Sequence, residues 1–173
     1  MSKLFRASRE DIEACFGGTL TELLRTTRLG VSDRYIQHGD TSVLLHSAAV
    51  AYYSYRLSRK LGLRGLKRRE LVRGGLLHDY FLYDWHKGSN GHGLHGFSHP
   101  ATALANARQD TEISQVEADM IARHMFPLTP VPPKSRAGWI ICLVDKVCSV
   151  YETFSRNVYT ELRSYVRGCQ LIG

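Results

Sequence analysis

The chain has 173 residues, 43% of them hydrophobic and 23% charged, and carries a formal net charge of +7 at pH 7. These values are ordinary for a soluble globular protein, and the length predicts one domain with a substantial hydrophobic core. No run of 18 apolar residues occurs, which excludes a transmembrane helix and predicts no membrane partner.

Apolar residues recur at helical spacing along nearly the whole chain, and no apolar–polar alternation runs for more than a few positions. The sequence therefore predicts an all-α fold, a single-domain helical bundle. The expected helices cover residues 8–16, 19–28, 42–61, 67–82, 98–110, 112–125, 134–155 and 158–167. The segments 29–39, 84–97 and 127–133 are expected to be loops.

Local signals place several of these boundaries. Asp40-Thr41 is a suitable N-cap for the third expected helix, and Gly62 is suited to end it. Pro100 fits the first turn of a helix. Gly74-Gly75 would lower helix propensity in the middle of the helix over 67–82, so we expect a close contact with another helix there.

The cysteines and the N-terminus indicate a cytoplasmic protein. None of the four cysteines belongs to a CxxC pair, so a cysteine zinc site is not expected. The first residues, MSKLFRASREDIEACF, are amphipathic and lack the apolar centre of a signal peptide. Reduced thiols and a cytoplasmic location are the expectation.

A set of histidines and aspartates falls on or beside the apolar faces of the expected helices. Its members follow one another at intervals of 20 to 32 residues, counting His78-Asp79 as one element: His46, His78-Asp79, His99, His124 and Asp145. Imidazole and carboxylate are ligands for divalent metals, and in helical bundles such sites are built from side chains on facing helices. Taken alone, His46 also fits a hydrogen-bonded core histidine, and Asp145 also fits a buried ion pair.

The order of these residues resembles the H…HD…D signature of the HD-domain superfamily of metal-dependent phosphohydrolases. The stretches LLHS, GGLLHDY and LVDKV carry the resemblance, which spans residues 40–155. It implies an HD-type helical bundle, with an HD domain over 40–155, an N-terminal helical extension over 1–39 and a C-terminal helical tail over 156–173, all in one compact domain.

The two additional histidines, His99 and His124, resemble those of HD domains with a binuclear centre, among them a bacterial group of diadenosine tetraphosphate hydrolases with a similar compact layout. The resemblance implies that Asp79 is catalytic as a carboxylate bridging two divalent metal ions, iron or manganese ahead of nickel, zinc or magnesium. The implied ligands are His46, His78, Asp79 and Asp145 for one ion, with His99 and His124 completing the second. The reaction implied is attack of a metal-activated hydroxide on a phosphate ester or anhydride, with a nucleotide as the expected substrate.

One departure from the family concerns the substrate. Many HD hydrolases carry a lysine three residues after the HD pair, and Leu82 stands there in this chain. The residues expected to contact an anionic, phosphorylated small molecule instead are Lys87, His95, Arg123 and Lys146. The basic stretch from Arg56 to Arg73 fits a solvated helix surface or the attraction of that anion, and without a nucleic-acid motif we expect no nucleic-acid partner.

Two alternatives stay open at this point. Some HD-domain proteins use a similar six-residue set to hold a di-iron centre that activates oxygen, and the missing lysine is compatible with that chemistry. A regulatory or ligand-binding HD module without enzymatic activity is the other alternative. The sequence predicts no particular oligomeric state.

Overall fold

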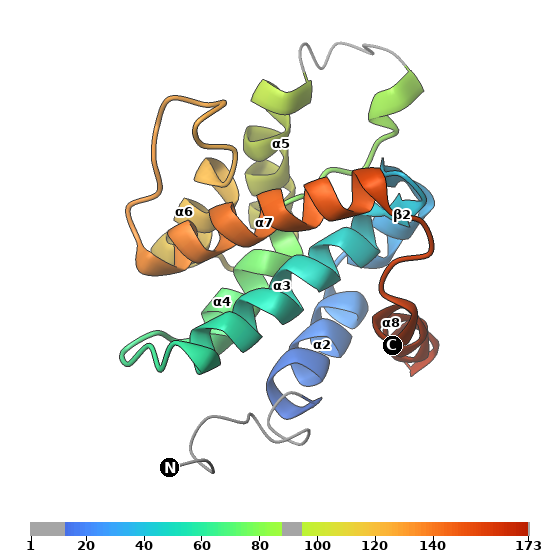
Figure 1. Ribbon diagram of the computed structural model, residues 1–173, viewed down its shortest axis with the longest axis horizontal. Coiled ribbons are helices and arrows are strands. Elements are labelled where there is room, and N and C mark those ends of the chain that lie inside the picture. Colours follow the sequence, from blue (N-terminus) through green and yellow to red (C-terminus); the bar gives the residue numbers. More distant parts are fainter. Residues whose placement is uncertain (1–12, 88–94, 173) are drawn as a thin grey trace.

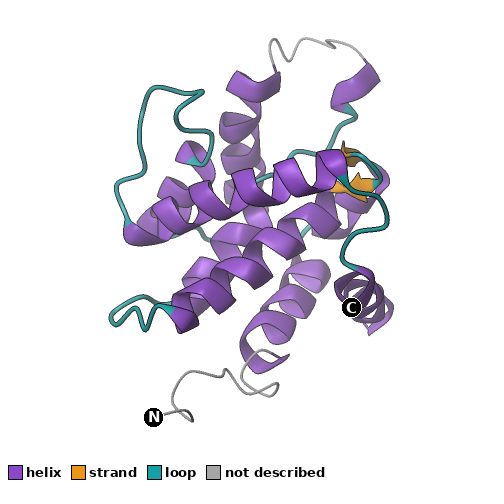
Figure 2. Cartoon of the chain, in the orientation of Figure 1, coloured by secondary structure: helices purple, strands orange, loops and turns teal. Residues whose placement is uncertain are grey.

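The computed structural model describes residues 13–87 and 95–172, and its fold is all-α, as predicted. After a π-helical turn, Glu13–Gly17, the helices are α2 (Gly18–Thr26), α3 (Val43–Lys60), α4 (Arg68–Leu77), α5 (His95–Asp110), α6 (Gln115–Arg123), α7 (Arg136–Phe154) and α8 (Thr160–Ile172). Two short strands, β1 (Ile36–His38) and β2 (Thr41–Ser42), pair antiparallel before α3 (Figure 2). Within the described residues, no helix combines the length and apolar character needed to cross a membrane.

Helices α3 and α4 form the centre of the bundle. Helix α7 packs against α3, α6 packs against both α4 and α7, and α5 packs against α6 (Figure 1). One apolar core lies among α2, α3, α4, α5 and α8, and a second lies among α3, α4, α6 and α7. The side chains that matter for function come from the helices that these two cores hold together.

The predicted close contact at the glycine pair is present. A Cβ atom on Gly75 would lie 2.7 Å from the Cα of Ala51 in α3, so only glycine allows the two backbones to approach this closely. On the other side of α4, a Cβ on Gly74 would overlap the side chain of Met120 in α6. The glycines therefore allow α3 and α6 to pack tightly against α4.

Several predicted boundaries were wrong. The segment expected as a loop over 29–39 contains a 3₁₀ helix, Leu29–Arg34, and strand β1. The N-cap of α3 is Ser42, whose hydroxyl accepts a hydrogen bond from the Leu45 amide, and not Asp40-Thr41. Helix α4 ends at Leu77 instead of residue 82. Helix ends depend on local hydrogen bonds and backbone geometry that apolar spacing does not reveal.

The second half shows similar differences. Helix α5 begins at His95, inside the expected loop over 84–97, so Pro100 is its sixth residue and not in its first turn; a proline there removes one hydrogen bond, the one to Gly96. Helix α6 begins later than expected because Ser114 and Glu117 form a capping box. Helix α8 continues to Ile172. The expected helix over 8–16 lies largely outside the described residues, as does half of the loop over 84–97.

Candidate metal centre

Five helices supply the six predicted ligands. His46 lies in the first turn of α3, His78-Asp79 directly follows α4, and Asp145 is in the middle of α7. His99 is in the second turn of α5, and His124 directly follows α6. None of the six is more than 6% exposed. Residues far apart in the chain thus meet at one buried, polar place between the helices.

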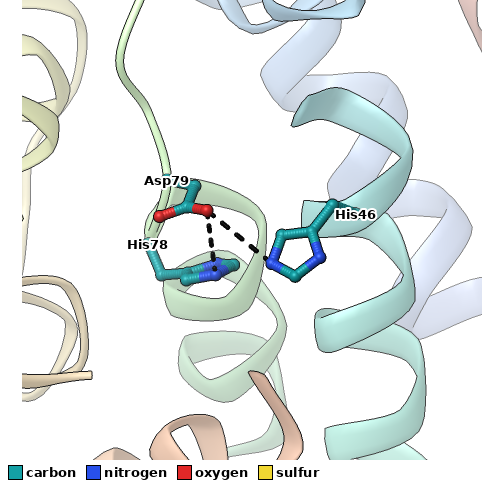
Figure 3. Close-up of side chains that lie close together, drawn as sticks. All are labelled: His46, His78 and Asp79. Atoms are coloured by element: carbon teal, nitrogen blue, oxygen red, sulfur yellow. Dashed lines mark ion pairs between the residues drawn. The ribbon is translucent and has the colours of Figure 1, made fainter. Parts of the chain in front are cut away.

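Asp79 lies at the centre of this cluster. Its Oδ2 is 3.7 Å from Nε2 of His46 and 3.6 Å from Nε2 of His78 (Figure 3). Its Oδ1 faces the other two histidines, 3.2 Å from Nε2 of His99 and 3.4 Å from Nε2 of His124. The two oxygens of one carboxylate therefore face two separate pairs of imidazoles.

Asp145 completes the side of the cluster formed by α3 and α4. Its Oδ1 lies 3.2 Å from Nε2 of His46 and 3.5 Å from Nε2 of His78. Burial acts to raise the pKa of Asp145, but the hydrogen bonds and charges of His46 and His78 outweigh it and hold the pKa well below its usual range. Burial also acts to raise the pKa of Asp79, which the imidazoles of His78 and His99 likewise hold well below its usual range. Both groups are therefore carboxylates, able to bind a cation.

The four imidazoles share one orientation. In each ring Nδ1 lies 2.8 to 3.0 Å from an oxygen that can only accept a hydrogen bond, so Nδ1 carries the proton. The pairs are His46 with Glu152, His78 with the Gly75 carbonyl, His99 with the His95 carbonyl, and His124 with the Ile121 carbonyl. A ring held in this way directs Nε2 toward the aspartates, and when Nε2 carries no proton its lone pair is available there, as in metal-binding histidines.

The positions of these lone pairs are unfavourable without a cation. Nε2 of His99 and Nε2 of His124 are 2.9 Å apart, and in neutral rings with protonated Nδ1 both atoms are acceptors. Nε2 of His78 and Oδ1 of Asp79 are buried without a hydrogen bond. Buried acceptors without a partner are costly. A bound metal ion would satisfy all four atoms, so the residues present fit a metal.

Among the residues that the structure describes, three groups of ligand atoms are close enough together to hold a metal ion. Within each group the atoms lie within 4.8 Å of one another, and the groups are His46–His78–Asp79, Asp79–His99–His124 and His78–His124–Asp145. Asp79 belongs to two of these groups. The cluster can therefore hold metal ions through nitrogen and oxygen ligands, a set that suits iron, manganese, zinc or nickel.

The four predicted substrate contacts have different surroundings. The His95 ring stacks on His99 with centroids 4.6 Å apart, and its Nδ1 lies 3.0 Å from the Tyr83 hydroxyl. The Lys146 ammonium donates to the His124 carbonyl at 2.7 Å. These two residues therefore border the cluster.

Of the other two predicted contacts, Arg123 is engaged elsewhere, and Lys87 is described only in its backbone. The Arg123 guanidinium donates to the Pro132 carbonyl and pairs with Asp119, so it holds the loop after α6. Lys87 ends the 3₁₀ helix Trp85–Lys87, and its side chain lies outside the described part of the chain.

Sequence reasoning missed several residues that contact the ligands, among them Glu152 and Gln37. Glu152 in α7 is fully buried and accepts a hydrogen bond from Nδ1 of His46. The Gln37 side-chain amide, in β1, donates to Oδ2 of Asp79 at 2.6 Å. Glu152 lies seven residues after Asp145, two helical turns along the same face, and that spacing could have revealed it. Gln37 fell in a segment predicted as loop, and no pattern indicated it.

The helical bundle and its buried His/Asp cluster are compatible with the HD-type fold that the sequence resembles. No model of a known protein family matches the chain, and no curated protein or solved structure matches it.

Proposed function

We propose that this protein is an HD-type, metal-dependent phosphohydrolase with a binuclear centre, acting on a phosphate ester or anhydride of a nucleotide. The observation that carries the proposal is the arrangement around Asp79. Its two oxygens face two pairs of Nε2 atoms, and the His99–His124 pair is only 2.9 Å apart. One carboxylate between two imidazole pairs is suited to be shared by two ions.

The ligands divide into two sets with Asp79 common to both. His46, His78, Asp79 and Asp145 would hold one ion, and Asp79, His99 and His124 would hold the other. When bound, such ions lower the pKa of water and neutralise charge on phosphoryl oxygens. The carboxylate of Asp79 stays ionised in this environment, and the Nδ1 hydrogen bonds fix each ring before any ion binds, which preorganises the site.

The surroundings of the cluster support an anionic substrate. The chain carries a net charge of +7, which favours the approach of anions. Lys146 supplies a cationic group beside the ligands, with its side chain 40% exposed. His95, stacked on His99, supplies a second nitrogen-bearing ring at the edge of the cluster. We assign both residues to contact with the phosphorylated substrate, in place of the lysine that Leu82 replaces.

The test compares two isosteric substitutions on the chain. Asp79→Asn should lower bound metal at least about tenfold, by analogy with the effect of disturbing ligand partners, and should abolish phosphate release from a panel of nucleotides and phosphoesters. Glu70→Gln changes a partly exposed carboxylate on α4 that pairs with Lys67, and should leave metal content and activity unchanged. Metal is measured by mass spectrometry on protein purified without chelator.

Three outcomes would contradict the proposal. A wild-type protein loaded with iron or manganese that releases phosphate from no member of the panel would exclude the reaction class tested. Oxygen consumption by the iron-loaded protein, without phosphate release, would favour the oxygenase alternative. Equal metal content in the wild type and in Asp79→Asn would show that Asp79 does not hold the ion.

A further inference from the structure

Helix α7 presents a continuous apolar face to the outside of the molecule. Between residues 139 and 154, which the structure describes in full, the exposed residues other than Thr153 are apolar or aromatic. Lys146, whose side chain is 40% exposed, lies at the edge of this face. These residues form the α7 stripe: Trp139, Leu143, Val147, Val150, Tyr151 and Phe154, with exposed fractions from 48% to 84%. In Figure 1 α7 lies across the near face of the molecule, with no other described element drawn in front of it.

The opposite face of α7 is buried in the molecule. It contributes Ile141, Val144 and Cys148 to the second core, and it carries Asp145 and Glu152 at the metal centre. A surface helix of a globular protein normally has a polar outer face, whereas a helix that is hydrophobic all round is buried on all sides. The sequence of α7 is thus that of a helix covered on both faces.

The size of the stripe fits a protein interface. With about 150–250 Å² for a full aromatic side chain, the exposed fractions correspond to roughly 600–700 Å² of apolar surface on one copy. The largest apolar patch on a typical monomer is about 300–600 Å². Stable pairs of proteins bury about 800 Å² on each partner, so the stripe and its rim supply nearly all the area that a dimer requires.

The order of residues in the stripe is self-complementary. Leu143 precedes Val147 by four positions and Tyr151 follows it by four, while Trp139 and Phe154 lie eight before and seven after. When two α7 helices cross antiparallel about a two-fold axis at Val147, Leu143 meets Tyr151 of the second copy, and Trp139 falls opposite position 155, next to Phe154. A surface that pairs with itself in this way is the requirement for a two-fold dimer.

We propose that the α7 stripe is a homodimer interface, in which two copies of this chain pack α7 against α7 antiparallel about a two-fold axis near Val147. The charged residues nearest the ends of the stripe, Arg136 and Arg156, are exposed and lie beyond it, where solvent screens them at the rim. A lipid surface fits less well, because membrane-surface helices carry lysine and arginine along their polar face, and the opposite face of α7 holds Asp145 and Glu152 instead.

The experiment introduces a charge of either sign at Val147, on the proposed two-fold axis, in the 173-residue chain. Sedimentation equilibrium of the wild type should give twice the 19.6 kDa chain mass. Val147→Lys and Val147→Glu should each raise the dimer dissociation constant about 100-fold or more, as expected for a charge at the centre of an interface. An equimolar mixture of the two variants should recover the dimer, because the axis places one lysine opposite one glutamate.

A matched control separates the interface from a general effect of surface charge. Leu61→Lys replaces another exposed apolar residue, 58% exposed at the end of α3 and outside the stripe, and should leave the dimer intact. Circular dichroism verifies that each variant is folded. A monomeric wild type at about 100 µM, well above the dissociation constants of standard interfaces, would overturn the proposal. So would a dimeric Val147→Lys, a mixture that stays monomeric, or a monomer that binds anionic lipid vesicles through α7.

Discussion

In each histidine of the candidate metal centre, the hydrogen bond at Nδ1 determines which ring nitrogen faces the cluster. Three of these bonds go to backbone carbonyls three or four residues earlier, at the ends of α4 and α6 and in the first turn of α5. The fourth goes to the carboxylate of Glu152, which is 106 residues from His46 in the sequence. A carboxylate partner raises the basicity of the ring and fixes its orientation. Glu152 at Nδ1 would therefore orient His46 and strengthen Nε2, the nitrogen near Asp79, as a ligand.

Substitution of Glu152 should therefore weaken metal binding without removing a ligand. For Glu152→Gln we expect a metal affinity about 10- to 100-fold lower than that of the wild type, because the neutral amide holds the Nδ1 proton of His46 less strongly. Competition with a chromophoric chelator measures this affinity. Glu161→Gln, at an exposed position of α8, is the control. An unchanged affinity in Glu152→Gln would show that the backbone alone orients His46.

The sequence could predict which six side chains meet, but not the groups that support them. His46, His78 and Asp145 stand out because each is a polar residue in an apolar helical context. Glu152 and Gln37 are ordinary polar residues whose importance comes from tertiary contacts spanning 106 and 42 residues. Such contacts depend on how β1 and α7 pack, which no local pattern encodes.

Among the secondary-structure elements, α4 allows its neighbours α3 and α6 to pack closely against it. Its interior glycines were predicted to mark a close helix–helix contact, and the distance from Gly75 to Ala51 confirms this. Helix existence was predictable from apolar spacing, whereas the ends of α3, α4 and α6 were not. Helix ends depend on local interactions such as the hydrogen bond that Ser42 accepts. The spacing of apolar residues carries no information about such interactions.

The same substitution at two helical glycines should have opposite effects on stability. Gly75→Ala places a methyl group 2.7 Å from the backbone of Ala51, and we expect a loss of about 1–3 kcal/mol in the free energy of unfolding from overpacking. In α8, a Cβ on Gly168 meets nothing within 4 Å, so Gly168→Ala should add about 0.5–1 kcal/mol from helix propensity. Urea denaturation measures both. A neutral Gly75→Ala would mean that α3 and α4 can separate without cost.

At the scale of the whole molecule, we expect metal binding at the candidate centre to be linked to folding. Five helices contribute ligands, and the free protein leaves buried acceptors such as Nε2 of His78 without partners. Because an ion that binds only the folded state stabilises it by mass action, metal at about 100 times its dissociation constant should add about 2.7 kcal/mol.

Thermal unfolding tests this linkage. The melting temperature of the wild type should rise by several degrees on addition of manganese or iron(II), since about 1 kcal/mol corresponds to about 2–4 °C in a domain of this size. Asp79→Asn should show little change under the same conditions. Equal shifts in the two proteins would place the stabilising ion elsewhere in the molecule.

The distribution of the ligands over five helices also bears on how fast an ion can leave. The ligands of an ion held as proposed come from several helices, so we expect its release to need α4, α5 and α6 to move apart at their ends. That separation is a local unfolding event, slower than the dissociation of an ion from an exposed loop. For an ion held as proposed, extraction by an excess of chelator should therefore follow the opening rate of the bundle and not the chelator concentration. The helix packing that brings the histidines together would thus also set the lifetime of the metal-bound protein.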